Sequence, residues 1–123
     1  MFFQEDWIMR QITMMVQVIA RMLNKEEIFY SVSGQATYVH TDMLHARLME
    51  LLMDGYINEA ENFLFENIRM GHSEDLWVAA DFYERLNAMS DTYLQAHDFS
   101  RDELKAGLEE IMALYGVGLM PSP

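Results

Sequence analysis

The sequence contains no cysteine, which excludes disulfide bonds, thiolate nucleophiles and zinc sites with cysteine ligands. Basic side chains are also scarce: 8 Lys and Arg stand against 20 Asp and Glu, and the net charge at pH 7 is −12. This negative charge repels the phosphates of nucleic acids and of anionic membrane surfaces. We therefore expect neither a nucleic acid nor a membrane among the partners of the chain.

The sequence also lacks the signals for export and for membrane insertion. Glu5 and Asp6 stand where a secretory signal carries positive charge, and the uncharged run over residues 11–20 is too short to span a bilayer. We expect a cytoplasmic protein.

Catalytic motifs are missing from the sequence. It contains neither the Gly-x-Ser-x-Gly pattern of a nucleophilic serine nor a glycine-rich phosphate loop. The adjacent carboxylates Glu109 and Glu110 point to different sides of a helix, so they cannot act on one substrate as a pair. We therefore expect that the protein is not an enzyme and that it uses no cofactor.

What the sequence does contain is apolar residues at helical spacing. Hydrophobic residues make up 51% of its 123 residues, which is enough for one core, so we predict a single all-α domain over residues 1–123. About five helices are predicted. A long helix over residues 4–29 is followed by a loop over 30–40, helical hairpins over 41–70 and 74–115, and a tail over 117–123.

Several residues mark where these helices begin and end. Thr41 and Ser73 are predicted to cap the first helix of each hairpin. Gly55 is predicted to end a helix in the left-handed conformation. Ser100 is predicted to form a capping box with Glu103 at the start of the last helix. Residues 74–96 are predicted to form one helix, bent near the serine at position 90.

The first helix carries a seam of apolar residues at alternating spacings of four and three, as in a short coiled coil. Other apolar residues lie off this seam, so the helix is apolar on more than one face. A second copy of the chain is the simplest partner for the surplus, and the alternative is that a compact monomer covers both faces. Trp7 is either an anchor in such an interface or a cover over the core. We predict a dimer with the interaction residues Trp7, Ile8, Ile12, Met15, Ile19 and Met22.

A second candidate function is the binding of a small molecule or a metal ion in a pocket between the hairpins, near His45, Tyr83 and Tyr93. Asp42 and His45 stand three residues apart and suit a metal ion, but the Glu-x-x-His pairs of di-metal helical bundles are absent, so no metal site is predicted. The aromatic residues of the helix over 74–96 line either a groove or the core.

Two stretches of the sequence are similar to each other. Residues 55–68 align with residues 98–111, which pairs Tyr56 with Phe99 at a period of about 43 residues. A period of this length suits a repeat made of two helices.

The turn at Gly55 and Tyr56, followed by Glu59 and Ala60, resembles the second-helix entry of tetratricopeptide repeats. This resemblance implies right-handed packing of the helical hairpins. The chain also resembles a family of short bacterial proteins of unknown function in three segments: QEDWIMRQI, GYINEAENFLFE and DFSRDELKAGLEEI. That resemblance implies a self-contained helical domain and adds no mechanism. We therefore predict a non-enzymatic helical protein for protein–protein interaction or self-association.

Overall fold

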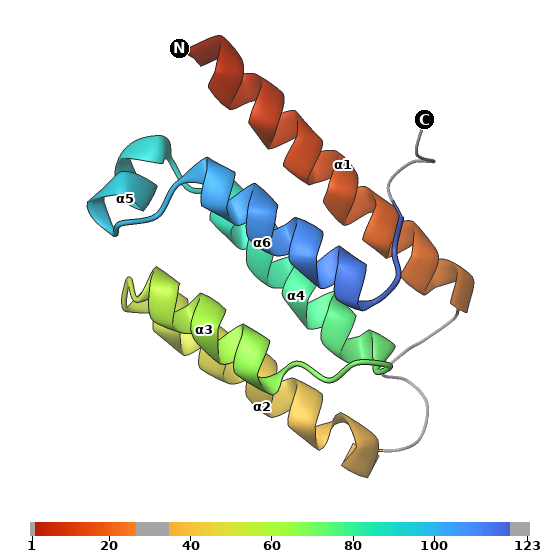
Figure 1. The fold of residues 1–123 in the computed structure, drawn as a ribbon. Helices are drawn as coiled ribbons and strands as arrows, with labels where there is room; N and C mark the ends of the chain where they lie inside the picture. The colour runs from red at the N-terminus through yellow and green to blue at the C-terminus, as the bar shows by residue number, and fades with distance from the viewer. Residues whose placement is uncertain (1, 27–34, 119–123) are drawn as a thin grey trace.

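The computed structural model describes residues 2–26 and 35–118, and within them every regular element is a helix (Figure 1). This confirms the prediction of an all-α protein. None of the helices in these two ranges has both the length and the apolar character needed to cross a membrane. The helices are α1 (Phe2–Glu26), α2 (Gln35–Met53), α3 (Ile57–Asn67), α4 (Ser73–Asn87), α5 (Asp91–Ala96) and α6 (Arg101–Leu114).

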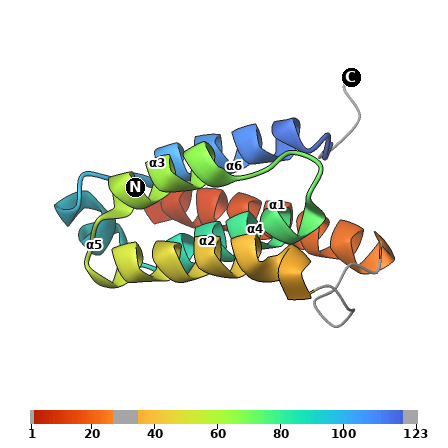
Figure 2. The ribbon, with the colours of Figure 1, turned by 90° about the horizontal axis from the view of Figure 1, so that it is seen from below.

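Helix α4 is the central helix of the fold. It packs against α1, α2 and α6, and α2 packs in turn against α3. Seen from below, α3 and α6 lie in one layer and α2 and α4 in the other (Figure 2). Helix α1 lies along α4 and α6, on the side away from the hairpin of α2 and α3 (Figure 1). One side of α1 therefore faces the core, and the opposite side faces away from the rest of the fold.

The core lies where these helices meet. The rings of Phe82 and Tyr83 in α4 are fully buried and pack edge to face, with centroids 5.0 Å apart. Ile12 and Ile19 of α1 are also fully buried, and each such side chain stabilises the fold by about 1.5–3 kcal/mol relative to an exposed one. The aromatic residues of α4 thus divide between core and surface, because Trp77 is 41% exposed.

Helix α2 begins at Gln35, earlier than the predicted start at Thr41. The predicted loop is therefore wrong for residues 35–40, and residues 30–34 lie outside the described ranges. Thr41 does not cap the helix: its side chain is buried, and its Oγ1 donates a hydrogen bond of 2.6 Å to Asp75 Oδ1 of α4. A buried threonine hydroxyl inside a helix needs such a partner, and this one stands 34 residues further along the chain.

The predicted helix over residues 74–96 is two helices in the structure, α4 and α5. Helix α4 ends at Asn87, and Ser90 caps α5 by accepting a backbone hydrogen bond of 3.0 Å. The buried guanidinium of Arg101 donates to the carbonyl oxygens of Asn87 and Met89. Because these bonds satisfy carbonyl groups that the end of a helix leaves open, α4 can stop inside the fold.

Two other predicted helix starts differ in outcome. The capping box is confirmed: Ser100 Oγ accepts a hydrogen bond of 3.1 Å from the Glu103 amide, and the Ser100 amide donates one of 3.1 Å to Glu103 Oε1. Ser73 is the first residue of α4 and His72 holds the cap position, so that prediction is wrong by one residue.

The turns after α2 and α5 share one backbone geometry. Gly55 has a φ of +83° and Asp98 has a φ of +59°, both in the left-handed region. The amide that follows each of these residues donates to the carbonyl five residues before it, at 2.9 Å in both turns. These bonds define the Schellman motif, in which a left-handed residue ends a helix. The prediction for Gly55 is confirmed, and Asp98 holds the position that the alignment pairs with it.

The predicted alignment of residues 55–68 with residues 98–111 matches the two turns correctly. For the two helices that follow, it is wrong by one residue. Helix α3 begins directly after Tyr56, whereas Ser100 separates the second turn from α6. The buried faces of α3 and α6 consequently match one residue later than the alignment places them. In order, Ile57, Ala60 and Leu64 correspond to Arg101, Leu104 and Leu108. The tetratricopeptide-like packing stays a prediction.

A buried carboxylate ties the helices together at the end where α4 begins. Asp75 is fully buried, and it accepts hydrogen bonds from Thr41 and from Arg69, whose Nε lies 2.9 Å from Asp75 Oδ2. The Tyr115 hydroxyl, just after α6, donates to the Arg69 carbonyl. Burial alone raises the pKa of Asp75, but the hydrogen bonds from Arg69 and Thr41 outweigh it and lower the pKa. Asp75 is therefore ionised at neutral pH.

Replacing Asp98 with glycine tests the shared turn geometry. A side chain in the left-handed region costs about 1 kcal/mol, and the Asp98 side chain has no hydrogen bond with another described residue. We expect Asp98→Gly to raise the free energy of unfolding in urea by about 0.5 kcal/mol, since the relieved strain exceeds the added freedom of the unfolded chain. The converse change, Gly55→Asp, introduces a Cβ 2.7 Å from His97 Nε2 and should destabilise the fold. A loss of stability in Asp98→Gly would contradict this account.

Candidate functional site

One side of α1 combines exposed apolar side chains with positive charge. Trp7 is 56% exposed and Met14 is 60% exposed. Both lie on the side of the helix opposite to its buried residues, together with Arg10, Gln17 and Arg21, because residues three, four and seven apart share a helix face. We call these five residues the outer face of α1.

Most of the predicted interaction residues lie on the inner side of the helix. Ile12, Met15 and Ile19 are at most 2% exposed where α1 packs on α4 and α6. Ile8 and Met22 are partly buried against the same core. A second copy of the chain cannot reach the three buried side chains, so the interaction prediction is wrong for them. Of the predicted set, the tryptophan of the outer face is the residue that stays largely exposed.

Charge distinguishes the outer face of α1 from most of the chain. Residues 7–24 contain two arginines and no acidic residue, whereas the whole chain has 20 acidic and 8 basic side chains. A partner that carries the same negative charge is repelled least at a surface without carboxylates. At the edge of this face, Gln11 Oε1 is buried without a hydrogen-bond partner among the described residues. Such unsatisfied buried groups are rare in folded proteins.

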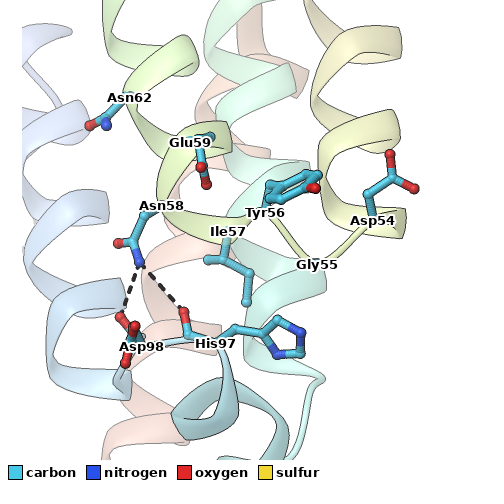
Figure 3. Close-up of a pocket in the computed structure, with 9 residues that line it drawn as sticks. All are labelled: Asp54, Gly55, Tyr56, Ile57, Asn58, Glu59, Asn62, His97 and Asp98. Atoms are coloured by element: carbon cyan, nitrogen blue, oxygen red, sulfur yellow. Dashed lines mark hydrogen bonds between the residues drawn. The ribbon is translucent and has the colours of Figure 1, made fainter.

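A shallow depression of about 500 Å³ lies between the two Schellman turns. Asn58 of α3 reaches across to the second turn, where its Nδ2 donates to the Asp98 carbonyl at 3.1 Å (Figure 3). On the other side of the same contact, the His97 ring packs so closely on Gly55 that a Cβ at residue 55 would lie 2.7 Å from His97 Nε2. The two turns are thus held together by a hydrogen bond from the Asn58 side chain and by the contact of the His97 ring with Gly55, and the depression lies beside them.

Carboxylates surround this depression. Asp54, Glu59 and Asp98 line it, no lysine or arginine does, and none of the three has an ion pair within the part of the chain that the structure describes. They lie apart from one another in Figure 3. Across residues 7–24 and 39–118, no three His, Asp or Glu side chains are placed to hold a metal ion. The depression therefore lacks the convergent groups that a catalytic or tight small-molecule site requires.

The three residues predicted to line a ligand pocket lie in separate places. His45 Nε2 lies 2.8 Å from Asp81 Oδ2 on the surface between α2 and α4. The Tyr93 ring packs on His97 beside the turns, with centroids 4.2 Å apart. Tyr83 is fully buried in the core. The structure does not bring these residues to one pocket.

A carboxyl and a phenol meet inside the contact between α3, α4 and α6. The Tyr83 hydroxyl donates a hydrogen bond of 2.6 Å to Glu61 Oε2. Gly107 of α6 faces the pair, and a Cβ there would collide with the Glu61 carboxylate and lie 2.5 Å from the Tyr83 hydroxyl oxygen. The sequence gives one signal for this pair, which is a glycine inside a predicted helix, where close approach of a neighbour is a common reason.

The Glu61 carboxyl sits in a place that disfavours its charge. Burial raises its pKa above the ordinary 4.5, the hydrogen bond from Tyr83 acts in the opposite direction, and the charges of Glu103 and Glu110 raise the pKa further. Burial and the Glu61 charge also raise the pKa of Tyr83, so its hydroxyl remains protonated and continues to donate.

Comparison with known proteins identifies a family. A model of a family of unknown function, DUF6483, matches residues 2–116. No curated protein and no solved structure matches the chain. The match agrees with the predicted resemblance to a family of unknown function, whereas a bacterial origin and a relation to tetratricopeptide repeats stay predictions.

Replacing Gly107 with alanine tests the close approach of the three helices. In an ordinary helix this change stabilises by about 1 kcal/mol. Here we expect a loss of about 1–3 kcal/mol in the free energy of unfolding, because the new methyl group must displace the Glu61–Tyr83 pair. Gly118→Ala is the control, since no atom lies within 4 Å of a Cβ at that position. Unfolding in urea followed by circular dichroism measures both, and a gain for Gly107→Ala would contradict the collision.

Replacing Glu61 with glutamine tests the cost of its charge. A raised pKa means that Glu61 stabilises the fold below about pH 4.5 and that this contribution is lost as pH rises through the folded-state pKa. Glutamine keeps an oxygen for Tyr83 and carries no charge, so we expect a higher Tm at pH 7 and a smaller gain at pH 4. Glu59→Gln, an exposed residue of the same helix, is the matched control. A lower Tm for Glu61→Gln at pH 7 would mean that the ionised hydrogen bond outweighs burial.

Proposed function

The chain belongs to the DUF6483 family, whose function is unknown, and we propose from its own surfaces that it is a non-enzymatic helical module for protein–protein interaction. In this proposal the chain self-associates, most simply as a dimer, through the outer face of α1. One observation carries the proposal: Trp7 and Met14 stay exposed on a helix face that has no carboxylate over residues 7–24, in a chain with a net charge of −12.

The residue types on this face are those that interfaces favour. Tryptophan, methionine and arginine are enriched in the centres of protein interfaces, and tryptophan and arginine often contribute most of the binding energy. From Trp7 to Arg21 the face extends about 21 Å along the helix, at a rise of about 1.5 Å per residue. It is therefore a continuous stripe and not a single exposed side chain.

The surface around Met53 supports self-association less well. Met53 is 86% exposed at the end of α2, but Asp54 follows it directly and two further carboxylates line the adjacent depression. Two copies that met there would bring like charges together. The ligand-binding alternative is also weaker, because its predicted residues occupy separate places in the fold.

Light scattering on the purified protein tests the proposal. We expect a mass near twice the chain mass of 14.4 kDa at high concentration and a shift towards the monomer on dilution below about 1 µM. A monomer at every concentration up to about 500 µM would overturn self-association.

Charge substitutions locate the surface. We expect Met14→Glu and Trp7→Glu each to weaken the dimer at least about tenfold, since each places a carboxylate at the centre or the end of the stripe. Met53→Glu is the matched control, because it adds the same charge at a more exposed methionine away from α1. Circular dichroism checks that every variant folds.

Ile12 and Met15 are unsuitable for this test, since an aspartate at either buried position would disturb the core. Equal weakening by Met53→Glu would argue against α1.

A further inference from the structure

We infer that two copies pair through the outer faces of their α1 helices in antiparallel orientation, with the two-fold axis at Met14. This inference rests on the proposed function, and it adds the orientation of the copies and the contacts between them. It follows from where the apolar and charged residues stand along α1.

The spacing of the outer face is symmetric about Met14. Trp7 and Arg21 each stand seven residues away, about 10.5 Å along the axis and within about 20° of the same angular position. An antiparallel pair centred on Met14 therefore sets Trp7 of each copy against Arg21 of the other. A guanidinium on the face of an indole is a favourable cation–π contact. Trp7 and Arg21 thereby become complementary anchors at both ends of the interface.

The glutamines fit the same register. Gln11 and Gln17 each stand three residues from Met14, so Gln17 of the second copy comes level with Gln11 along the axis, at the other edge of the interface. Gln11 Oε1 has no hydrogen-bond partner among the described residues. Once the Gln11 side chain turns towards the interface, the amide of Gln17 in the second copy can donate to it. The antiparallel pair thus supplies a donor that the single chain does not offer.

A parallel pair is less favourable on the same evidence. It sets Arg10 against Arg10 and Arg21 against Arg21, so that positive charges meet in the interface. It also leaves Trp7 without an arginine and Gln11 opposite another Gln11. The antiparallel order avoids each of these contacts.

The position of α1 in the fold favours the same partner. Helix α1 lies on the side of α4 and α6 away from α2 and α3 (Figure 1). A pair formed through α1 therefore keeps the hairpin of α2 and α3 in one copy and the same hairpin in the other copy at opposite ends of the dimer. Since one pair of helices is a small interface, the dimer should dissociate at micromolar concentrations.

Single cysteines test the register, because the chain has none of its own. A disulfide requires Cα atoms about 4.4–6.8 Å apart. In the proposed pair, the two copies of residue 14 face each other at the two-fold axis and meet this requirement. Under mild oxidation we expect Met14→Cys to form covalent dimers at least about tenfold faster than Met53→Cys, although Met53 is more exposed at 86% than Met14 at 60%. Non-reducing gel electrophoresis over time measures the rates.

Two further variants test the orientation. Trp7→Cys alone and Arg21→Cys alone should cross-link slowly, because each residue lies about 21 Å along the axis from its own copy in the partner. A mixture of the two should cross-link at least about tenfold faster than either alone. Fast linkage of Trp7→Cys to itself would indicate a parallel pair and overturn the inference.

The remaining outcomes separate this inference from the proposed function. A dimer in light scattering with equal cross-linking of Met14→Cys and Met53→Cys would overturn the register and leave self-association intact. That outcome would be expected for a different dimer, in which Arg10 or Arg21 of one copy binds an acidic face of the other copy. A monomer in light scattering would overturn both proposals.

Discussion

The buried carboxylate of Asp75 is the interaction on which the arrangement of the helices depends. It lies in the first turn of α4 and holds Thr41 of α2 and Arg69 of the connection before α4, while Tyr115 beyond α6 binds the carbonyl of the same arginine. An ionised carboxylate can be buried only where donors replace its water, and loss of one partner from such a set costs about 3–5 kcal/mol. The folded chain therefore requires these four segments to meet at this point.

At the opposite end of the fold, further polar contacts complete the arrangement. Asn58 joins the turn after α2 to the turn after α5, and the guanidinium of Arg101 joins the end of α4 to α5 and α6. Asn87, which Arg101 binds, also donates to the Met9 carbonyl of α1. Polar groups thus fix the relative positions of the helices at both ends, and apolar side chains fill the space between them. Hydrophobic burial supplies most of the stabilisation, whereas these directional bonds select one packing among several that would bury similar area.

Local patterns in the sequence predict the structure correctly where interactions within one turn of helix determine it. The capping box at Ser100 and the left-handed Gly55 were predicted correctly, because each depends on residues within one turn of helix. The start of α2 is predicted wrongly, because Thr41 finds its partner 34 residues along the chain. The interruption near Ser90 is predicted only as a bend, because Arg101 of α6 binds the carbonyl groups at the end of α4. The interaction surface failed for a related reason. Helix α1 is apolar on more than one side, and only its packing on α4 and α6 decides which side is buried.

The charge of α1 carries more information about function than its hydrophobicity does. A folded chain requires buried apolar residues for its core, and it requires a charged surface for its solubility. Neither requirement explains why a surface helix of this chain has no carboxylate over residues 7–24 while exposing Trp7 and Met14. The absence of acidic residues from an exposed apolar stripe lowers the solubility of the chain and does not stabilise the fold of an isolated copy. The same pattern is favourable if the stripe faces a second acidic chain, since two such chains approach with least repulsion where neither carries negative charge.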